Sequence, residues 1–289
     1  MTSFNEKRIF RLPEGREMVN EIRLQELFQS IGIDISSSSS PSESSDQKES
    51  YYEINLSNKS FSSNAAILLA NYLQSSKDSI HILNLSDIIA GRHEDEALLV
   101  LATLCNIFIP YQNQLVEVNI SDNALGRKGI LACQNILQGN YIQKLYFCNN
   151  GLSAEASELI TDILLQQNGY ERNDPTTTTT TPTGCPPLEV LHFYNNMSGT
   201  AGAQSSSQII LAITNTLRDF RYSATRSGTE GCLPIAQALC QTSNLTHLDL
   251  SDNSFGEEVL DALASAISRQ VQSLLIKYFS DLLFPLCCF

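Results

Sequence analysis

The sequence predicts an α/β solenoid in which short parallel strands alternate with helices, and three observations lead to this fold class. A pattern of apolar residues around an asparagine recurs from Tyr51 onward, with a period of roughly 27–29 residues where no insertion intervenes. An apolar stretch with helical spacing follows each copy of the pattern. Glycines occur at the junctions, where a strand must turn sharply into a helix.

The repeated pattern is L-x-x-L-x-L-x-x-N-x-L, which is typical of leucine-rich repeats. Three copies fit at every position, with Val or another apolar residue replacing some leucines: Leu115, Val118, Ile120, Asn123 and Leu125; Ile142, Leu145, Phe147, Asn150 and Leu152; and Leu245, Leu248, Leu250, Asn253 and Phe255. Four more copies fit in part. They begin near Tyr51, Ile80, Leu188 and Leu217, and their residues at the asparagine position are Lys59, Ile88, Asn196 and Thr225. About seven copies in series indicate a true repeat protein.

Each part of the pattern has a physical reason. The L-x-L segment is a short strand whose alternate side chains enter the core. The asparagine closes the following turn by bonding to backbone groups that have no partner in the sheet. Helices are expected to include residues 130–137, 154–165, 233–239 and 259–267. A strand and a helix in every repeat predict a horseshoe of the ribonuclease-inhibitor type, with parallel strands inside and helices outside.

The remaining segments complete the predicted organisation. Helical spacing of apolar residues over Glu17 to Ile33, among them Val19 and Ile22, predicts an N-terminal helical segment, residues 1–35. A Ser-rich linker, residues 36–50, leads to the repeat domain, residues 51–272. Threonines and prolines predict a disordered insertion near residues 168–187. An apolar tail without the repeat, residues 273–289, either packs over the last repeat or belongs to a truncated chain.

Charge and cysteine content narrow the possible partners. Acidic side chains number 31 against 18 basic ones, for a formal net charge of −13, so neither nucleic acid nor an anionic membrane surface is an expected partner. The eight cysteines form no C-x-x-C pair, and no metal site is expected. No segment predicts a secretory signal or a membrane span, which favours the cytoplasm.

Enzyme motifs do not appear. The chain contains neither a phosphate-binding G-x-x-x-x-G-K-[ST] run, nor a G-x-G-x-x-G run, nor a G-x-S-x-G nucleophile turn. Its four histidines do not combine with other residues into a metal or nucleophile site. The sequence therefore indicates a binding protein without a cofactor and without an enzymatic site of its own.

Several segments go beyond a generic repeat. They are NLSDIIAGR at 84–92, VNISDNALG at 118–126, LYFCNNG at 145–151, LHFYNNMSG at 191–199 and DFRYSATR at 219–226. Between about Tyr52 and Ile267 the chain resembles the RanGAP family, the GTPase-activating proteins of the small GTPase Ran, and most of all its plant and algal branch. The N-terminal WPP-type domain of the plant proteins and the acidic tail of the family are not visible in the chain.

The resemblance implies a GTPase activator. It would act on GTP-bound Ran, switch it to the GDP form, and so support nucleocytoplasmic transport. The activator would be a monomer located in the cytoplasm or around the nucleus. It would not itself be an enzyme. In this family an asparagine is understood to orient the glutamine of the GTPase that positions the attacking water.

The family asparagine maps best to Asn149. Asn150 is the alternative, but it occupies the turn-closing position, where the backbone should use its side chain. Arg92, in the run I-A-G-R, matches an arginine of the family that is usually placed at the Ran interface. Since Arg92 and Asn149 are two repeats apart and neighbouring strands are about 4.8 Å apart, we expect their loops roughly 10 Å from each other.

The resemblance also suggests residues that contact the partner. Those at or beside the turns are Asp87, Asp122, Asn150, Asn195 and Asp252. Solvated turn aspartates are an equally good interpretation of the acidic ones. The alternative function is a leucine-rich-repeat scaffold or inhibitor without catalytic effect, and the side-chain directions of Arg92 and Asn149 should separate the two functions.

Overall fold

The computed structural model describes residues 8–33, 51–74, 80–166, 185–269 and 275–276. The chain divides into two compact units, Met1–Ile142 and Gln143–Phe289. The predicted linker, most of the predicted insertion and residues 277–289 of the predicted tail lie outside the described residues. None of the helices in the described ranges combines the length and apolar character needed to cross a membrane.

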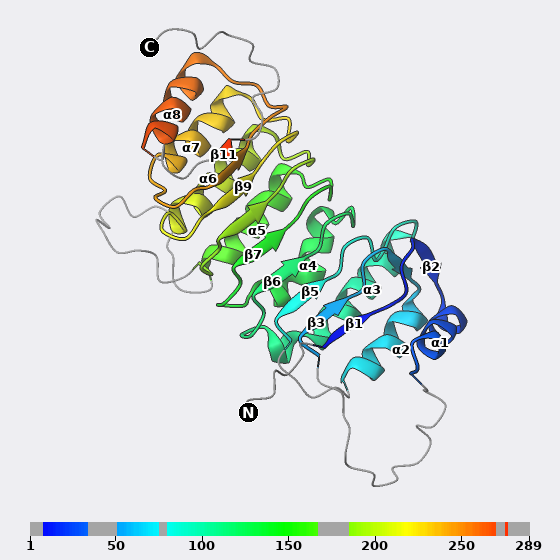
Figure 1. Ribbon diagram of the computed structural model, residues 1–289. Coiled ribbons are helices and arrows are strands. Elements are labelled where there is room, and N and C mark those ends of the chain that lie inside the picture. The colour runs from blue at the N-terminus through cyan, green and yellow to red at the C-terminus, as the bar shows by residue number, and fades with distance from the viewer. Residues whose placement is uncertain (1–7, 34–50, 75–79, 167–184, 270–274, 277–289) are drawn as a thin grey trace, which may run out of the picture. The chain divides into compact units, whose positions relative to one another are not determined.

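The first unit contains a parallel sheet with the order β1 (Ile9–Arg11), β3 (Glu53–Asn55), β5 (Ile82–Asn84) and β6 (Glu117–Asn119). A smaller parallel pair is formed by β2 (Glu17–Val19) and β4 (Lys59–Phe61). The helices are α1 (Glu21–Ser30), α2 (Ser63–Gln74), α3 (Glu94–Ile107) and α4 (Gly126–Leu137), with a 3₁₀ turn, η1, at Ile109–Tyr111. The helices after α1 follow their strands in the order strand, turn, helix (Figure 1).

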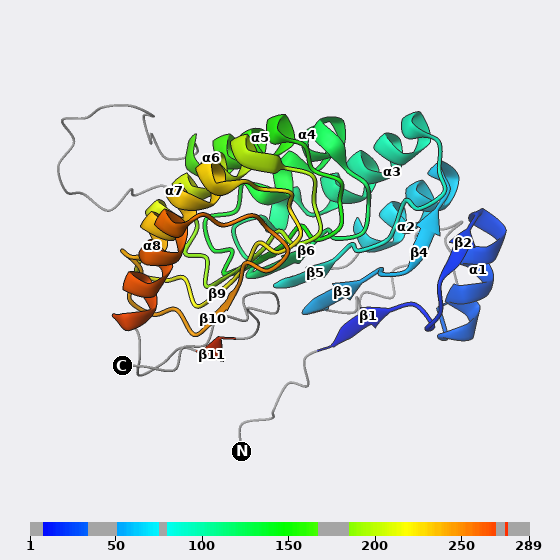
Figure 2. The same ribbon diagram turned by 90° about the horizontal axis from the view of Figure 1, so that it is seen from above.

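The second unit repeats this arrangement. Its parallel strands are β7 (Lys144–Tyr146), β8 (Val190–His192), β9 (Asp219–Arg221), β10 (His247–Asp249) and β11 (Leu275–Ile276). Its helices are α5 (Ala154–Gln166), α6 (Gly199–Ala212), α7 (Thr229–Leu239) and α8 (Glu257–Ser268). Figure 2 shows these helices along one face of their own strands. Both units therefore have the leucine-rich-repeat α/β architecture, and the predicted fold class is confirmed.

The core of each unit lies between its strands and its helices. The middle residue of every three-residue repeat strand is buried, as the alternation of side chains in a strand requires: Ile54, Leu83, Val118, Leu145, Leu191, Phe220 and Leu248. In the second unit the rings of Phe147 and Phe193 stack with centroids 5.2 Å apart. The apolar positions of the repeat pattern thus form the core that the sequence predicts.

The N-terminal segment differs from the prediction. The helix begins at Glu21, because Glu17–Val19 pair with β4 as a strand. Val19 is buried through this strand, whereas Ile22 is 68% exposed and does not belong to the apolar face. The helical spacing that joined the two residues was coincidental. The segment also adds β1 to the main sheet of the first unit, in register with β3.

The start of the predicted tail also differs from the prediction. Leu275 and Ile276 pair with His247 and Leu248 of β10, which places β11 in the register of a further repeat. The sequence pattern missed this strand because no asparagine follows it at the usual spacing.

Lys59 occupies the asparagine position of the first repeat and is only 1% exposed. Its ammonium group donates to the Gly15 carbonyl and to the Glu17 carboxylate, each at 2.7 Å. Hydrogen bonds from Lys59, and then from Arg23, lower the pKa of Glu17. The lysine thus connects the first repeat to the N-terminal segment, where later repeats use an asparagine.

We expect Lys59→Met to lower the free energy of unfolding by about 2 kcal/mol, because the carbonyl of Gly15 loses its donor and Glu17 loses a cation. Urea denaturation measures this change. The matched control is Lys128→Met, which removes an ion pair to Glu94 in which both side chains are mostly exposed, and which should leave stability unchanged. Equal effects of the two substitutions would contradict the structural role of Lys59.

Candidate functional site

The turns after the strands are held by buried asparagines. In the first unit Asn123 is 2% exposed, and its Oδ1 accepts from the backbone N–H of Ile88 at 2.9 Å. Its Nδ2 donates to the carbonyls of Leu85, Ile120 and Ser121 at 2.8 to 3.0 Å. One amide therefore satisfies backbone groups of its own turn and of the preceding repeat.

The second unit shows the same arrangement twice. Asn196 donates to the carbonyls of Phe147 and Phe193 and accepts from the N–H groups of Asn150 and Leu152. The contacts of Asn253 reach back in the same way, to Tyr222, Thr225 and Ser227. The turn-closing role that the sequence predicts for this asparagine is confirmed.

The residue directly before the asparagine position of the repeat pattern has a left-handed backbone in each of the seven repeats that the sequence pattern defines. We call this the edge position, and its residues are Asn58, Asp87, Asp122, Asn149, Asn195, Ala224 and Asp252, with φ between 51° and 63°. Asparagine and aspartate tolerate this conformation better than other residues with a side chain, which explains their frequency here. Most of these side chains are exposed, so the edge position is where a repeat can present polar groups to a partner.

Asn149 and Asn195 are neighbours at the edge position of the second unit, and both side chains are exposed. Nδ2 of Asn195 donates to Oδ1 of Asn149 at 2.8 Å. Exposed apolar side chains follow β8 in the same turn: Tyr194 is 39% exposed and Met197 is 56% exposed. This combination of an amide pair and exposed apolar surface suits contact with another protein.

Asn150 lies at the turn-closing position and is 1% exposed. Its backbone N–H donates to Oδ1 of Asn196 at 3.0 Å. The burial corrects the expectation that Asn150 contacts a partner. Of the two adjacent asparagines, Asn149 is the one whose side chain a partner can reach.

Asp87 is buried, in contrast to the other acidic residues at the edge position. Arg16, from the segment before β2, binds both of its carboxylate oxygens, with Nη2 at 3.0 Å and Nε at 2.6 Å. The hydrogen bond and charge of Asp87, together with the charge of Asp122, raise the pKa of Arg16. This corrects the expectation that Asp87 contacts a partner, since Arg16 already occupies its carboxylate. Asp122 and Asp252 are exposed, as expected.

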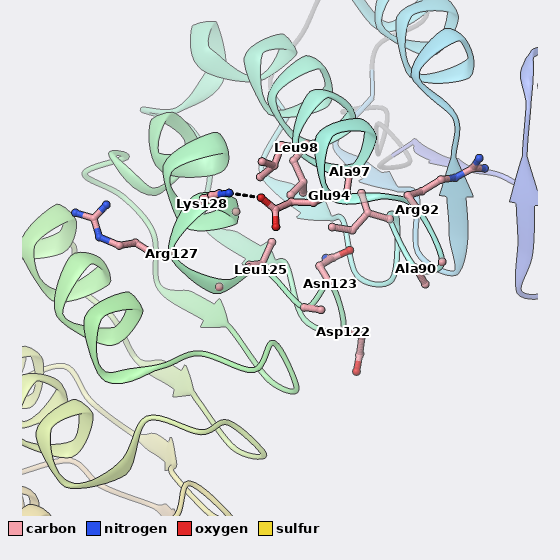
Figure 3. Close-up of a pocket in the computed structure, with 16 residues that line it drawn as sticks. Ala90, Arg92, Glu94, Ala97, Leu98, Asp122, Asn123, Leu125, Arg127 and Lys128 are labelled. Carbon is pink, nitrogen blue, oxygen red and sulfur yellow. Dashed lines mark hydrogen bonds and ion pairs between the residues drawn. The ribbon is translucent and has the colours of Figure 1, made fainter.

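Arg92 lies in the connection between β5 and α3, and its side chain is 12% exposed. Its guanidinium makes two hydrogen bonds to Ser60. Nη2 donates to the backbone carbonyl at 2.6 Å, and Nε donates to the hydroxyl at 3.2 Å. Figure 3 shows this side chain extending toward β4. Arg92 belongs to the first unit and Asn149 to the second, so their expected separation stays a prediction.

A pocket of about 620 Å³ lies in the first unit between the β5–α3 and β6–α4 connections (Figure 3). Leu98, Leu101 and Leu125 contribute apolar surface, and the ion pair between Glu94 and Lys128 stands beside them. In the described part of the chain no group of three or more His, Cys, Asp or Glu side chains could hold a metal.

A polar cluster on β8 and β9 was not predicted. Asp219 binds Arg221 through both carboxylate oxygens, at 3.0 and 2.9 Å, and Nε2 of His192 lies 3.1 Å from its Oδ1. Burial acts to raise the pKa of Asp219, but the contacts with His192 and Arg221 are stronger and hold the pKa at about 2. Alternation along the paired strands is the signal that could have found the cluster, because it places these side chains on the face opposite the core.

The Asp219 cluster predicts a loss of stability in acid. Because the pKa of Asp219 is lowered in the folded protein, its carboxylate stabilises the fold at pH values above its ordinary pKa of 3.8. This contribution disappears as the pH falls toward 2. Relative to Asp219→Asn, we expect the unchanged chain to be more stable by about 1 kcal/mol at pH 6, with the difference vanishing near pH 2. Urea denaturation between pH 6 and pH 2 tests this prediction. A stability difference that does not change with pH would contradict the low pKa of Asp219.

Fold and turns together define a leucine-rich-repeat protein, and the Leucine Rich Repeat family model matches residues 244–266. A stretch of 102 residues, 35% of this chain, is 40% identical to RAN GTPase-activating protein 1 of Arabidopsis thaliana. A stretch of 99 residues, 33% of the chain, is 40% identical to RAN GTPase-activating protein 2 of the same plant. The resemblance that the sequence indicates is thus confirmed. The matched stretches span 19% and 17% of these relatives.

Proposed function

We propose that the chain activates GTP hydrolysis by a Ran-type small GTPase in its GTP-bound state, as a monomer and without a cofactor. The names of the two Arabidopsis relatives support this function. The observation that carries it is the exposed side chain of Asn149, at an edge position directly before the buried turn asparagine. We place the activity in the cytoplasm, including the surroundings of the nucleus, where it would support nucleocytoplasmic transport.

The proposed mechanism completes the active site of the partner. The amide of Asn149 bonds to the glutamine of the GTPase and holds it where it orients the attacking water, so that the gain in rate comes from positioning. No arginine needs to enter the phosphate site. Arg92 is less suited than Asn149 to direct contact with the GTPase, because its guanidinium is bound to Ser60. We infer that Arg92 maintains the conformation of the β5–α3 connection.

Several features suit binding to a basic surface of the GTPase. The formal net charge is −13, and Asp122 and Asp252 are exposed at edge positions. Charge of this kind accelerates association with an oppositely charged partner and makes it sensitive to salt. The exposed Tyr194 and Met197 would supply apolar contact beside Asn149.

Single-turnover hydrolysis of GTP on Ran, with and without the chain, tests the proposal. Acceleration that saturates with the concentration of the chain, and that is absent with an unrelated small GTPase, is the expected result. A folded chain that binds GTP-bound Ran without accelerating hydrolysis would overturn it in favour of a non-catalytic scaffold or inhibitor. A folded chain that does not bind Ran would overturn both the activity and the partner.

A further inference from the structure

We propose that Arg226 is a docking residue, whose guanidinium binds a carboxylate of the GTPase beside the edge positions of the second unit. The identity of the partner rests on the proposed function. Arg226 directly follows Thr225, the residue at the asparagine position of its repeat, and its side chain is exposed.

The backbone of Arg226 is left-handed, with φ of 59°. This conformation is unfavourable for a residue with a long side chain, because only glycine, asparagine and aspartate adopt it readily. It persists in a fold only where the surrounding structure holds the residue in it.

The two neighbours of Arg226 in the sequence hold it in this way. Oδ1 of Asn253 accepts from the N–H of Thr225 at 3.2 Å and from the N–H of Ser227 at 3.0 Å. Thr225 is 0% exposed and Ser227 is 1% exposed. With both neighbours buried and bound to one amide, the side chain between them is directed to the solvent.

The turn two repeats earlier is built with the same contacts but has a glycine. Oδ1 of Asn196 accepts from the N–H groups of Asn150 and Leu152, which lie on either side of Gly151. The φ of Gly151 is 62°. An arginine therefore occupies a position that suits glycine, and such strained residues are typical of functional sites.

The charge of Arg226 is not used within the described chain. Arg218 and Arg221, on the same repeat, are bound to carboxylates of the second unit. Among the residues that the structure describes, none forms an ion pair or a side-chain hydrogen bond with Arg226. A guanidinium in this state can bind a carboxylate of a partner through two parallel hydrogen bonds.

The surroundings of Arg226 suit a protein partner. Met197 has the equivalent position in the preceding repeat and is 56% exposed. Arginine and methionine are both enriched in protein interfaces. Asp252, at the edge position of the next repeat, is exposed and has the opposite charge. Opposite charges on successive repeats would fix the register in which the GTPase binds.

Dissociation constants for Ran loaded with a non-hydrolysable GTP analogue test the inference. Arg226→Gln removes the charge and keeps a polar side chain at the left-handed position. We expect its Kd to be about tenfold higher, with the difference shrinking as the salt concentration is raised. Arg226→Lys keeps the charge without the planar fork, and its Kd should lie between the two.

The matched control is Arg218→Gln, which removes the same charge from the opposite end of β9. Arg218 lies before the strand and Arg226 after it, so Arg218 is not at the edge that carries Asn149. We expect Arg218→Gln to change the Kd less than about twofold. A rise equal to that of Arg226→Gln would overturn the inference, because net charge alone would then explain the effect.

Arg226→Gly separates the side chain from the backbone. Glycine relieves the left-handed conformation, so the midpoint of urea denaturation should rise, while the Kd rises as in Arg226→Gln. Ala224→Gly relieves the same conformation, with φ of 51°, and leaves the cation in place. It should raise the midpoint without changing the Kd. A midpoint that falls in Arg226→Gly would overturn the inference, since the arginine would then serve the fold.

The binding measurement also separates this inference from the proposed function. An unchanged Kd in Arg226→Gln overturns the inference and leaves the proposed function in place. A chain that binds Ran without accelerating hydrolysis overturns the proposed activity alone, since the Kd still reports on Arg226. A folded chain that does not bind Ran overturns both.

Discussion

Asn149→Ala is expected to reduce kcat of the stimulated GTP hydrolysis on Ran about 100-fold, because the glutamine of the GTPase loses the group that orients it. The fold should survive, since the side chain is exposed and lies outside the buried turn contacts. Ala224 already has the left-handed backbone in this chain, so alanine at such a position costs only about 1 kcal/mol. Single-turnover kinetics at saturating chain concentration measure the loss.

The control for Asn149→Ala is Asp252→Ala. Asp252 is an exposed edge residue of the same unit, with φ of 56°, and the substitution changes the backbone in the same way. We expect less than a threefold change in kcat, with any effect confined to binding. Similar losses of kcat in the two variants would mean that Asn149 has no special part in the reaction.

Asn196→Ala is expected to have the largest effect on stability, a loss of about 3 kcal/mol or more. The amide of Asn196 satisfies buried backbone groups of Phe147, Asn150, Leu152 and Phe193, and each group left without a partner costs about 1–3 kcal/mol. Chemical denaturation, followed by circular dichroism, measures the difference.

The neighbouring residue provides the comparison for Asn196→Ala. Asn195→Ala removes an exposed amide with the same number of atoms one position earlier in the chain, and it should cost about 1 kcal/mol or less. A loss below about 1 kcal/mol in Asn196→Ala would mean that the backbone groups find other partners, and that the turn asparagine is not essential to the repeat.

Much of this fold follows from periodic residues. Val118, Leu145 and Leu248 predict the buried centres of strands, and Asn123 and Asn253 predict the turns that follow, because every repeat meets the same two requirements. The exposure of Asn149 could be predicted for the same reason. Once the next residue is used to close a turn, the residue before it projects outward.

Contacts made once in the chain could not be predicted in this way. Arg16 reaches Asp87 across 71 positions in sequence, and Arg92 reaches Ser60 across 32. Each contact depends on a connection particular to its own repeat, so no rule can be formed from the repeat pattern. Each depends on how a particular connection folds back on its neighbour, and the sequence around it carries no periodic signal.

The left-handed edge position has a consequence for how such a chain can change. The residues there can be exchanged among asparagine, aspartate, glycine and alanine at little energetic cost, while the next residue preserves the repeat. The residue that can contact a partner and the residue that closes the turn are therefore adjacent in the sequence. A substitution of the first can change recognition without disturbing the fold. New specificities can evolve by single steps along the edge, and a designer could rewrite the surface of the second unit by varying residues 149, 195, 224 and 252 alone.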